Sequence, residues 1–579
     1  MKTLQTWYIY SPVTGINKIK KIKLSKDEIG ENVLHEIEGR VLEESSTSLD
    51  QIENLIIQSH SISDNKKVTF APFHKIKQLC LLCNWENLGS NLIGGLEILE
   101  ALYILNNNYL TSIEIGFFKN QKSLKKLVIN NTKLLLQPAM LKGAPNLKEL
   151  DLRRNQLECV PLELFTDVPD MEKLVLAHNN ITNLPDKIFY DLPFLKEVDL
   201  SYNHFQEWNE EAFSYVNSLL HLNINNNNLG QLAPSSFRKL NSLVSLHLDN
   251  NNLENLEKES FAGLRRLNHL SINNNKLKTV DASSFNNLKF LKFLLLENNE
   301  ISCIAQKLFN NLGKVEVCHL EKNNISVLER NSFIGFSHLT TLHLNNMNLE
   351  RFEADWCIGL HSLTELNLND NKLTQLPSNA FHAIPKLAKL HLHGNLIESI
   401  DTRAFDNIYR LKYLDLSNNQ LKQSPGNEID NLYTVESLNL SKNHILTLDK
   451  NSLAAFRGVI DLNLSRNNIE IIHPDAFMAN EKLRNLNLSY NFIKTIVSWV
   501  YSVNLADLNL SFNQLSNIED VLVNFTNLKS IEIEGNYIKK IDLDSIIASS
   551  ILFMKFDEDN FKTEDVIEIK KILEKKQSA

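Results

Sequence analysis

The chain has 579 residues, of which 43% are hydrophobic and 22% are charged, and its mean hydropathy is −0.22. This balance predicts a folded protein with a sizeable core, and no apolar run reaches the ~18 residues that a membrane helix needs. The net charge of −9 argues against a nucleic-acid-binding protein, which would usually carry a basic face.

The first segment, residues 1–50, is irregular and is predicted to cap the N-terminal end of the fold. Within it, residues 19–29 look like a degenerate copy of the repeat that follows. The segment lacks the apolar run and the small-residue cleavage site of a secretory signal peptide. Two locations therefore stay open: an extracellular protein whose true start is missing or replaced, or a cytoplasmic protein.

A repeat occupies residues 51–540. Residues 147–157 read LKELDLRRNQL and residues 411–421 read LKYLDLSNNQL, and both fit LxxLxLxxNxL, where x is any residue. Self-similarity at a fixed period predicts a solenoid, here of about twenty repeats. The asparagine recurs in steps of 24 residues, interrupted once by Met347, at Asn155, Asn179, Asn203, Asn227, Asn251, Asn275, Asn299, Asn323, Asn371, Asn395, Asn419, Asn443, Asn467 and Asn491.

This pattern resembles the leucine-rich repeat family. A phenylalanine follows most of the asparagines by 10 residues, as Phe165 follows Asn155 and Phe189 follows Asn179, which is similar to the typical class of animal extracellular proteins. The overall style also resembles arthropod extracellular members such as chaoptin, Toll ectodomains and mosquito leucine-rich immune proteins. The resemblance implies an α/β fold, a curved horseshoe with a concave parallel β-sheet, that binds a partner without catalysis and without a cofactor.

The repeat has a simple physical basis. Alternate side chains of a strand face opposite ways, so the leucines of LxxLxL point inward, and no coil buries its apolar face without its neighbours. In the family the asparagine turns inward and hydrogen-bonds backbone groups, which implies a structural ladder. The recurring phenylalanines are predicted to form a second buried spine.

Residues 541–579 are predicted to be a helical cap. Residues 563–576 have acids in the first turn, lysines in the last turns, and apolar residues on one side, which is typical of an amphipathic helix. The alternative is a short segment for self-association, which would make the protein a homodimer.

Extracellular members of the family usually carry a cluster of cysteines in the cap at each end, and the six cysteines of this sequence form no such cluster at either end. Cys318 replaces a strand leucine and Cys357 replaces a spine phenylalanine, so both are predicted to be core thiols. Cys159 and Cys303 lie six coils apart, too far for a disulfide. Candidate glycosylation sites begin at Asn130, Asn180, Asn324 and Asn524. Four further sequons, at Asn439, Asn463, Asn487 and Asn509, arise from the tripeptide Asn-Leu-Ser (NLS) of the repeat consensus. Glycans at these positions would cover the concave face.

Catalytic motifs are missing from the sequence: it has no GxSxG, HExxH, Walker or kinase signature, so an enzyme and a metal site are not expected. The outward strand positions hold two candidate partner-binding patches. The central patch comprises Phe293, Leu295, Val317, His319, His343, Glu297 and Glu321. The N-terminal patch includes Leu82, Tyr103 and Leu105. An aromatic anchor with ionisable neighbours suits a binding hot spot, and adjacent histidines would titrate near pH 6.

The alternative for the N-terminal patch is that residues 1–50 fold over it. For the histidines the alternative is an ordinary solvated strand face. The sequence as a whole predicts a non-catalytic scaffold that recognises a protein or other macromolecule, not nucleic acid, through its concave face. An extracellular role in adhesion, receptor-like recognition or innate immunity is expected, and an intracellular scaffold or a self-associating adhesive protein is the alternative.

Overall fold

The computed structural model describes residues 5–6, 21–29, 53–62, 69–353, 355–427, 429, 432–496 and 504–578. The fold is a parallel β-solenoid of about 20 turns with little helix. The chain divides into two compact units: unit 1 is 1–277 with 283–291, and unit 2 is 278–282 with 292–579. Most of the predicted N-terminal cap, residues 1–50, lies outside the described residues.

Each coil contributes one inner strand that pairs in parallel with the strand of the next coil. In unit 1 these strands are β2 (Lys21–Ile29), β3 (Asn54–Ile62), β4 (Gln78–Cys83), β6 (Ala101–Leu105), β8 (Lys126–Asn130), β9 (Glu149–Asp151), β10 (Lys173–Val175), β11 (Glu197–Asp199), β12 (His221–Asn223), β13 (Ser245–His247) and β15 (His269–Ser271). In unit 2 they are β17 (Phe293–Leu295), β18 (Val317–His319), β20 (Thr341–His343), β22 (Glu365–Asn367), β24 (Lys389–His391), β26 (Tyr413–Asp415), β27 (Ser437–Asn439), β29 (Asp461–Asn463), β31 (Asn485–Asn487), β32 (Asp507–Asn509), β33 (Ser530–Glu532) and β34 (Phe553–Lys555).

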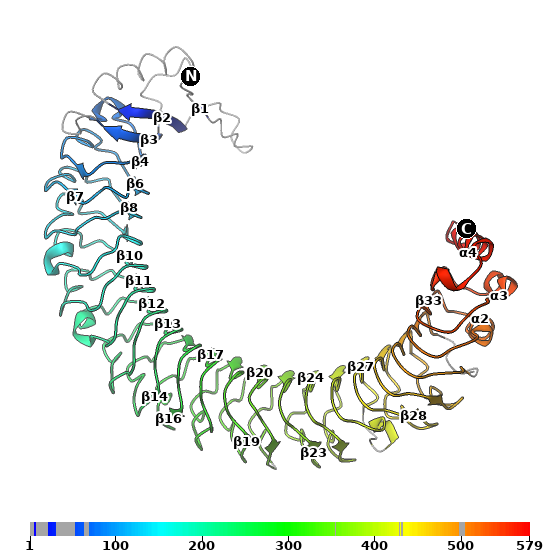
Figure 1. Cartoon of the computed structure of the whole chain (residues 1–579). Coiled ribbons are helices and arrows are strands. Elements are labelled where there is room, and N and C mark those ends of the chain that lie inside the picture. The colour runs from blue at the N-terminus through cyan, green and yellow to red at the C-terminus, as the bar shows by residue number, and fades with distance from the viewer. Residues whose placement is uncertain are drawn as a thin grey trace. The chain divides into compact units, whose positions relative to one another are not determined.

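Short elements occupy the rest of the coils. Two-residue strands are β5 (Asn87–Leu88), β7 (Ser112–Ile113), β14 (Asn255–Leu256), β16 (Thr279–Val280), β19 (Val327–Leu328), β21 (Arg351–Phe352), β23 (Gln375–Leu376), β25 (Ser399–Ile400), β28 (Thr447–Leu448) and β30 (Ile471–Ile472), and β1 (Gln5–Thr6) pairs antiparallel with β2. The helices are η2 (Ala71–Phe73), η3 (Leu162–Phe165), η4 (Glu210–Phe213), η5 (Pro425–Asn427), α2 (Glu519–Asn524), α3 (Leu543–Ala548), η6 (Glu558–Asn560) and α4 (Thr563–Gln577). Within unit 2, β17, β20, β24 and β27 lie along one edge of the coils, and β19, β23 and β28 lie along the opposite edge (Figure 1).

The predicted degenerate repeat near the N-terminus takes part in the same ladder. Strand β2 pairs in parallel with β3, with Ile22 opposite Leu55. Strand β3 pairs in turn with β4, with Leu55 opposite Leu79. The backbone of residues 21–29 is therefore in register with the regular coils of unit 1.

The asparagines of the repeat are buried between coils. Each of the fourteen that define the 24-residue period is at most 8% exposed. Asn251 is representative: its Nδ2 donates to the carbonyl oxygens of Ile224 and Leu248 at 3.0 and 3.1 Å, and its Oδ1 accepts from the Leu229 backbone at 3.1 Å. A buried amide needs such partners, because leaving one unpaired costs ~1–3 kcal/mol. The side chains therefore supply hydrogen bonds to backbone groups of their own and the preceding coils.

A second cause of the frequent asparagines lies one residue earlier. The position before the ladder residue has a positive φ, for example 57° at Asn226, 55° at Asn250 and 53° at Asn418. Asparagine tolerates this left-handed conformation better than most residues, so the Asn-Asn pairs serve two separate needs. Bulky residues also occupy the slot, including Tyr490 and Phe512, both with φ of 57°.

The phenylalanine spine is buried as predicted. The rings of Phe309 and Phe333 stack at 6.0 Å, and both side chains are 0% exposed. Where Cys357 takes the spine position, the preceding Trp356 is also buried, with its ring 5.8 Å from Phe333. Cys318 and Cys357 are both fully buried, as the sequence predicts, and burial raises the pKa of the Cys357 thiol to about 11.

The helix predicted at 563–576 is present as α4, which buries Val566, Ile569 and Leu573. Across the described part of the chain, the helices are too short and too polar for any of them to span a bilayer.

Candidate functional site

The first and third residues of each three-residue inner strand point away from the leucine core, and together they form what we call the strand face. On β17 and β18 these outward residues are Phe293, Leu295, Val317 and His319, all of them half-buried. The register places Phe293 opposite Val317 and Leu295 opposite His319. The structure therefore brings the apolar part of the predicted central patch together within unit 2.

The two predicted histidines stack on each other. His319 lies opposite His343, with ring centroids 4.5 Å apart and an interplanar angle of 15°. His319 Nδ1 lies 2.7 Å from Oε1 of Glu321. Glu321 itself is only 8% exposed, and its Oε2 has no hydrogen-bond partner among the described residues. Glu321 is thus a buried partner of His319 and not a surface carboxylate beside the patch.

These surroundings separate the two histidines electrostatically. The hydrogen bond to Glu321 raises the pKa of His319 above its ordinary value, although burial opposes it. Burial, followed by the charge of His319, lowers the pKa of His343. Burial of Glu321 favours its neutral acid, but the His319 hydrogen bond and nearby backbone groups prevail and lower the pKa of Glu321. The sequence predicts that both histidines titrate near pH 6. Their surroundings instead favour protonation of His319 and His343 at different pH values.

Glu297, two residues after β17, accepts from Lys322 Nζ at 2.8 Å. Beyond β20 the strand face becomes polar. On β24 the half-buried His391 has its Nε2 3.6 Å from Glu365 Oε1, and its ring lies 5.0 Å from the Tyr413 ring. Within the residues that the structure describes, no three His, Cys, Asp or Glu side chains are arranged to hold a metal ion.

The N-terminal patch lies in unit 1. Tyr103 and Leu105 on β6 and Leu82 on β4 are half-buried on neighbouring strands. Val128, opposite Tyr103, is only 7% exposed. The alternative is that residues 1–50 fold over this patch. Most of that segment lies outside the described residues.

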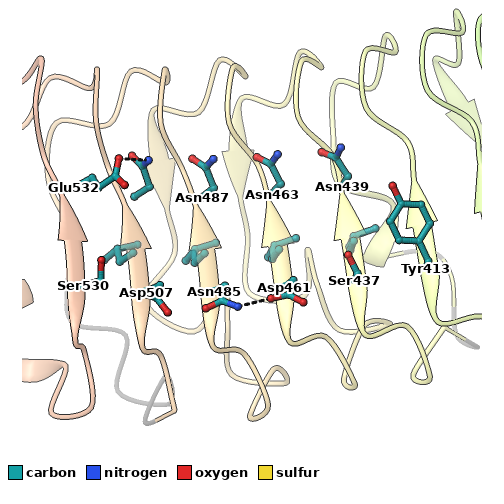
Figure 2. A pocket seen from close by; sticks show the side chains of 15 residues that line it. Tyr413, Ser437, Asn439, Asp461, Asn463, Asn485, Asn487, Asp507, Ser530 and Glu532 are labelled. Carbon is teal, nitrogen blue, oxygen red and sulfur yellow. Dashed lines mark hydrogen bonds between the residues drawn. The ribbon is translucent and has the colours of Figure 1, made fainter. Parts of the chain in front are cut away.

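A pocket of about 430 Å³ lies on the strand face of unit 2, and it was not among the predicted sites. Its outward side chains come from β26 to β33 and are almost all small and polar. They are Tyr413, Ser437, Asn439, Asp461, Asn463, Asn485, Asn487, Asp507, Asn509, Ser530 and Glu532 (Figure 2).

The asparagines in this pocket share one orientation. The side-chain oxygens of Asn439, Asn463 and Asn487 accept from the backbone N–H two residues later, at 3.0–3.1 Å. Figure 2 shows the three amides side by side on adjacent strands, each turned the same way. Their oxygens are therefore occupied locally, and their nitrogens remain as a row of donors.

The comparison with known families settles the fold class. The Leucine rich repeat family profile matches in ten overlapping segments that run from residue 97 to residue 493. These segments cover more than half of the chain. The chain belongs to the leucine-rich repeat family. Leucine-rich repeat solenoids are generally non-catalytic and typically bind proteins.

Solved leucine-rich repeat structures share this fold at low sequence identity. The Drosophila Toll–Spatzle complex is similar at 16% identity, with a TM-score of 0.65 and coverage of 92% of this chain and 90% of that chain. A leucine-rich repeat protein of Leptospira interrogans is similar at 24% identity, with a TM-score of 0.52 and coverage of 70% and 95%. The mouse RP105/MD-1 complex is similar at 20% identity, with a TM-score of 0.52 and coverage of 90% and 87%. No curated protein matches by sequence.

The candidate glycosylation positions differ in exposure. Asn180, Asn324 and Asn524 are exposed, whereas Asn130 is half-buried at the end of strand β8. Three of the four NLS asparagines, Asn439, Asn463 and Asn487, form the donor row of the pocket described above. The fourth, Asn509, extends this row, and its Nδ2 donates to Glu532 at 2.8 Å. The sequence-based interpretation treated these residues as repeat consensus and as sequons whose glycans would cover the concave face. The run of polar residues at outward positions was a further signal of the pocket.

Proposed function

We propose that this chain is a non-catalytic recognition protein that binds a protein or other macromolecular ligand through the strand face of unit 2. The observation that carries the proposal is the central patch, where Phe293, Leu295 and Val317 lie half-buried on two adjacent strands. Apolar and aromatic anchors surrounded by polar groups are typical of protein-binding hot spots. Paired strands hold these side chains in place before the ligand arrives, so binding costs little conformational entropy.

An extracellular site of action, with a receptor-like, adhesive or innate-immune role, is part of this proposal. Its support is the shared fold with Toll, which was solved in complex with Spatzle, and with RP105, which was solved with MD-1. Exposure of Asn180, Asn324 and Asn524 is compatible with N-glycosylation in a secreted protein. Finding the native protein only in the cytosol would favour the intracellular scaffold instead.

The central patch is tested by substituting one anchor. The full-length chain is used to capture its ligand from the extracellular fluid of the source organism, and the affinity for the ligand identified is then measured. Phe293→Ala is expected to weaken that affinity by about 1–2 kcal/mol, roughly fivefold to thirtyfold. The matched control is Phe290→Ala, which removes a ring that is 52% exposed in the turn just before β17.

The control variant should bind like the original chain. If Phe293→Ala also binds with unchanged affinity while its melting temperature is unchanged, the central patch is not the binding site.

A further inference from the structure

The pocket over β26 to β33 presents two parallel rows of polar side chains. One row is Ser437, Asp461, Asn485, Asp507 and Ser530, and the other is Asn439, Asn463, Asn487, Asn509 and Glu532. Strand pairing keeps each row in register across β27, β29, β31, β32 and β33. Neighbouring members of a row are therefore about 4.8 Å apart, the spacing between paired strands.

The rows offer hydrogen-bond donors and acceptors together. The amide nitrogens of Asn439, Asn463 and Asn487 are donors, because their oxygens accept from their own backbone. The opposite row supplies the carboxylates of Asp461 and Asp507, with serine hydroxyls at each end of the row. A hydroxyl group of a ligand both donates and accepts, so a chain of hydroxyls matches both rows at once.

Charge narrows the class of ligand. Carboxylates line the pocket and neither lysine nor arginine does, which disfavours anionic ligands such as nucleic acids and acidic glycans. Asp461 accepts from the Asn485 amide and Glu532 accepts from Asn509 at 2.8 Å, and both carboxylates keep their negative charge. Two of the three carboxylates are thus already engaged by neutral donors. The outward residues from Ser437 to Glu532 also provide no apolar anchor of the kind that protein ligands use.

Aromatic rings lie at both ends of the pocket and on the adjoining turns. Tyr413 precedes Ser437 in the register, and Phe553, 49% exposed, follows Ser530. On the turns after β31 and β32, the rings of Tyr490 and Phe512 stack on each other at 4.3 Å, and the Arg466 guanidinium lies 4.3 Å from the centre of the Tyr490 ring. These two rings are 41% exposed but already have partners, so the end rings Tyr413 and Phe553 are the candidate platforms. Aromatic faces accept the C–H faces of sugar rings, and binding sites often combine such surfaces with a few well-placed polar groups.

We propose that this pocket binds a neutral glycan chain that runs across the strands, with its hydroxyls between the two polar rows. The inference rests on the proposed recognition through the strand face and assigns a chemical class to one part of it. The central patch around Phe293 and this pocket would then act on the same glycosylated ligand or on different ones.

The test uses the full-length chain produced in the bacterial cytosol, where the asparagines carry no N-glycan. Calorimetry measures binding of three neutral hexaoses, of β-1,4-linked glucose, mannose and N-acetylglucosamine, against hexalysine and a hexamer of galacturonic acid. At least one neutral hexaose is expected to bind, with an affinity that added salt leaves unchanged, because exposed charge pairs alone are screened. Binding of hexalysine or of the acidic hexamer in preference to all three would overturn the inference.

The donor row is tested with an isosteric change. The double variant Asn463→Asp and Asn487→Asp keeps the side-chain oxygens that accept from the backbone and replaces the amide donors by acceptors. It is expected to weaken hexaose binding about tenfold or more. The control is Asn223→Asp in unit 1, whose side-chain oxygen makes the same backbone hydrogen bond at 3.1 Å outside this pocket. Equal hexaose affinity of the double variant and the original chain would overturn the inference.

The outcomes separate this inference from the proposed function. If no neutral hexaose binds, yet Phe293→Ala still weakens capture of the protein ligand, the glycan assignment fails and the proposed function stands. If a hexaose binds through Asn463 and Asn487 while Phe293→Ala has no effect, the pocket stands and the central patch fails. An N-glycan on Asn463 or Asn487 in the native protein would fill the pocket and would also overturn the inference.

Discussion

At the scale of single residues, Glu321 illustrates how neighbours decide the chemistry of an outward position. Glu321 comes two residues after the end of β18, which carries part of the central patch. Its side chain is nevertheless only 8% exposed and pairs with His319. His343 stacks on His319 without an equivalent carboxylate partner of its own in the described residues. Two histidines in the same register therefore have pKa values shifted in opposite directions.

We expect His319 to gain its proton at a higher pH than ordinary histidine and His343 at a lower pH. NMR of ¹³C-labelled histidine, recorded through the range around pH 6.5, would resolve two separate titrations. Glu321→Gln should lower the pKa of His319, whereas Glu297→Gln, whose carboxylate is paired with Lys322, should change it little. One shared titration midpoint in the unmodified chain would contradict this prediction.

The same shifts set the pH dependence of stability. The contribution of His319 is fully present below the unfolded pKa and is lost as pH rises through its raised folded pKa. The contribution of His343 is present above the unfolded pKa and is lost as pH falls through its lowered folded pKa. The opposite trends meet near the ordinary histidine pKa of about 6.5, where the pair stabilises the fold most.

At the scale of elements, the last helix depends on a contact that its own sequence does not reveal. Lysines at the end of a helix are expected to interact with that helix's own carbonyl end. In α4, however, Lys576 Nζ donates to the backbone carbonyls of Ile546 and Ser549, both at 2.6 Å, at the end of α3. The lysine of one helix therefore adds a charged donor at the carbonyl end of another helix, where the Ile546 carbonyl also accepts from Ser549 Oγ at 2.8 Å.

Replacing Lys576 by methionine should loosen the end of α3. The loss of hydrogen bonds from a charged donor is expected to cost about 1–3 kcal/mol of local stability. Hydrogen exchange of residues 543–549, followed by mass spectrometry, would measure it. Lys575→Met is the matched control, because its side chain is exposed. Equal exchange in the two variants would show that the Lys576 contact contributes no stability.

At the scale of the whole molecule, stability comes from contacts between neighbouring coils. Inner strands pair with the strands before and after them, and spine rings stack on the next ring, as Phe381 and Phe405 do at 5.8 Å. In such a solenoid the free energy of folding is close to a sum of local terms. Damage to one coil should therefore spread only to adjacent coils.

Phe405→Ala removes a ring that is 1% exposed and should cost about 3–5 kcal/mol. Hydrogen exchange is expected to rise in the coils on either side of Phe405 and to stay unchanged in unit 1. Tyr409→Ala, which truncates a side chain 48% exposed in the same coil, is the control. Faster exchange throughout both units would mean that the chain unfolds as a single cooperative block.

The sequence by itself determined the coil. A 24-residue period of leucine, asparagine and phenylalanine specifies which side chains are buried, because each coil repeats the same local geometry. It also placed Phe293, Leu295 and Val317 on one surface, since strand register follows directly from the period. What the sequence could not give was the environment of particular polar groups.

Only the tertiary structure decided which polar side chains are occupied and which are available. It buried Glu321 against His319, bound Lys576 to α3, and turned the amides of Asn463 and Asn487 so that their donors form a row. The physical reason is that burial follows from a periodic apolar pattern, whereas a hydrogen bond depends on the orientation of individual side chains. That holds whether the partner lies two residues away, as for His319 and Glu321, or in a later part of the chain, as for Lys576 and Ile546.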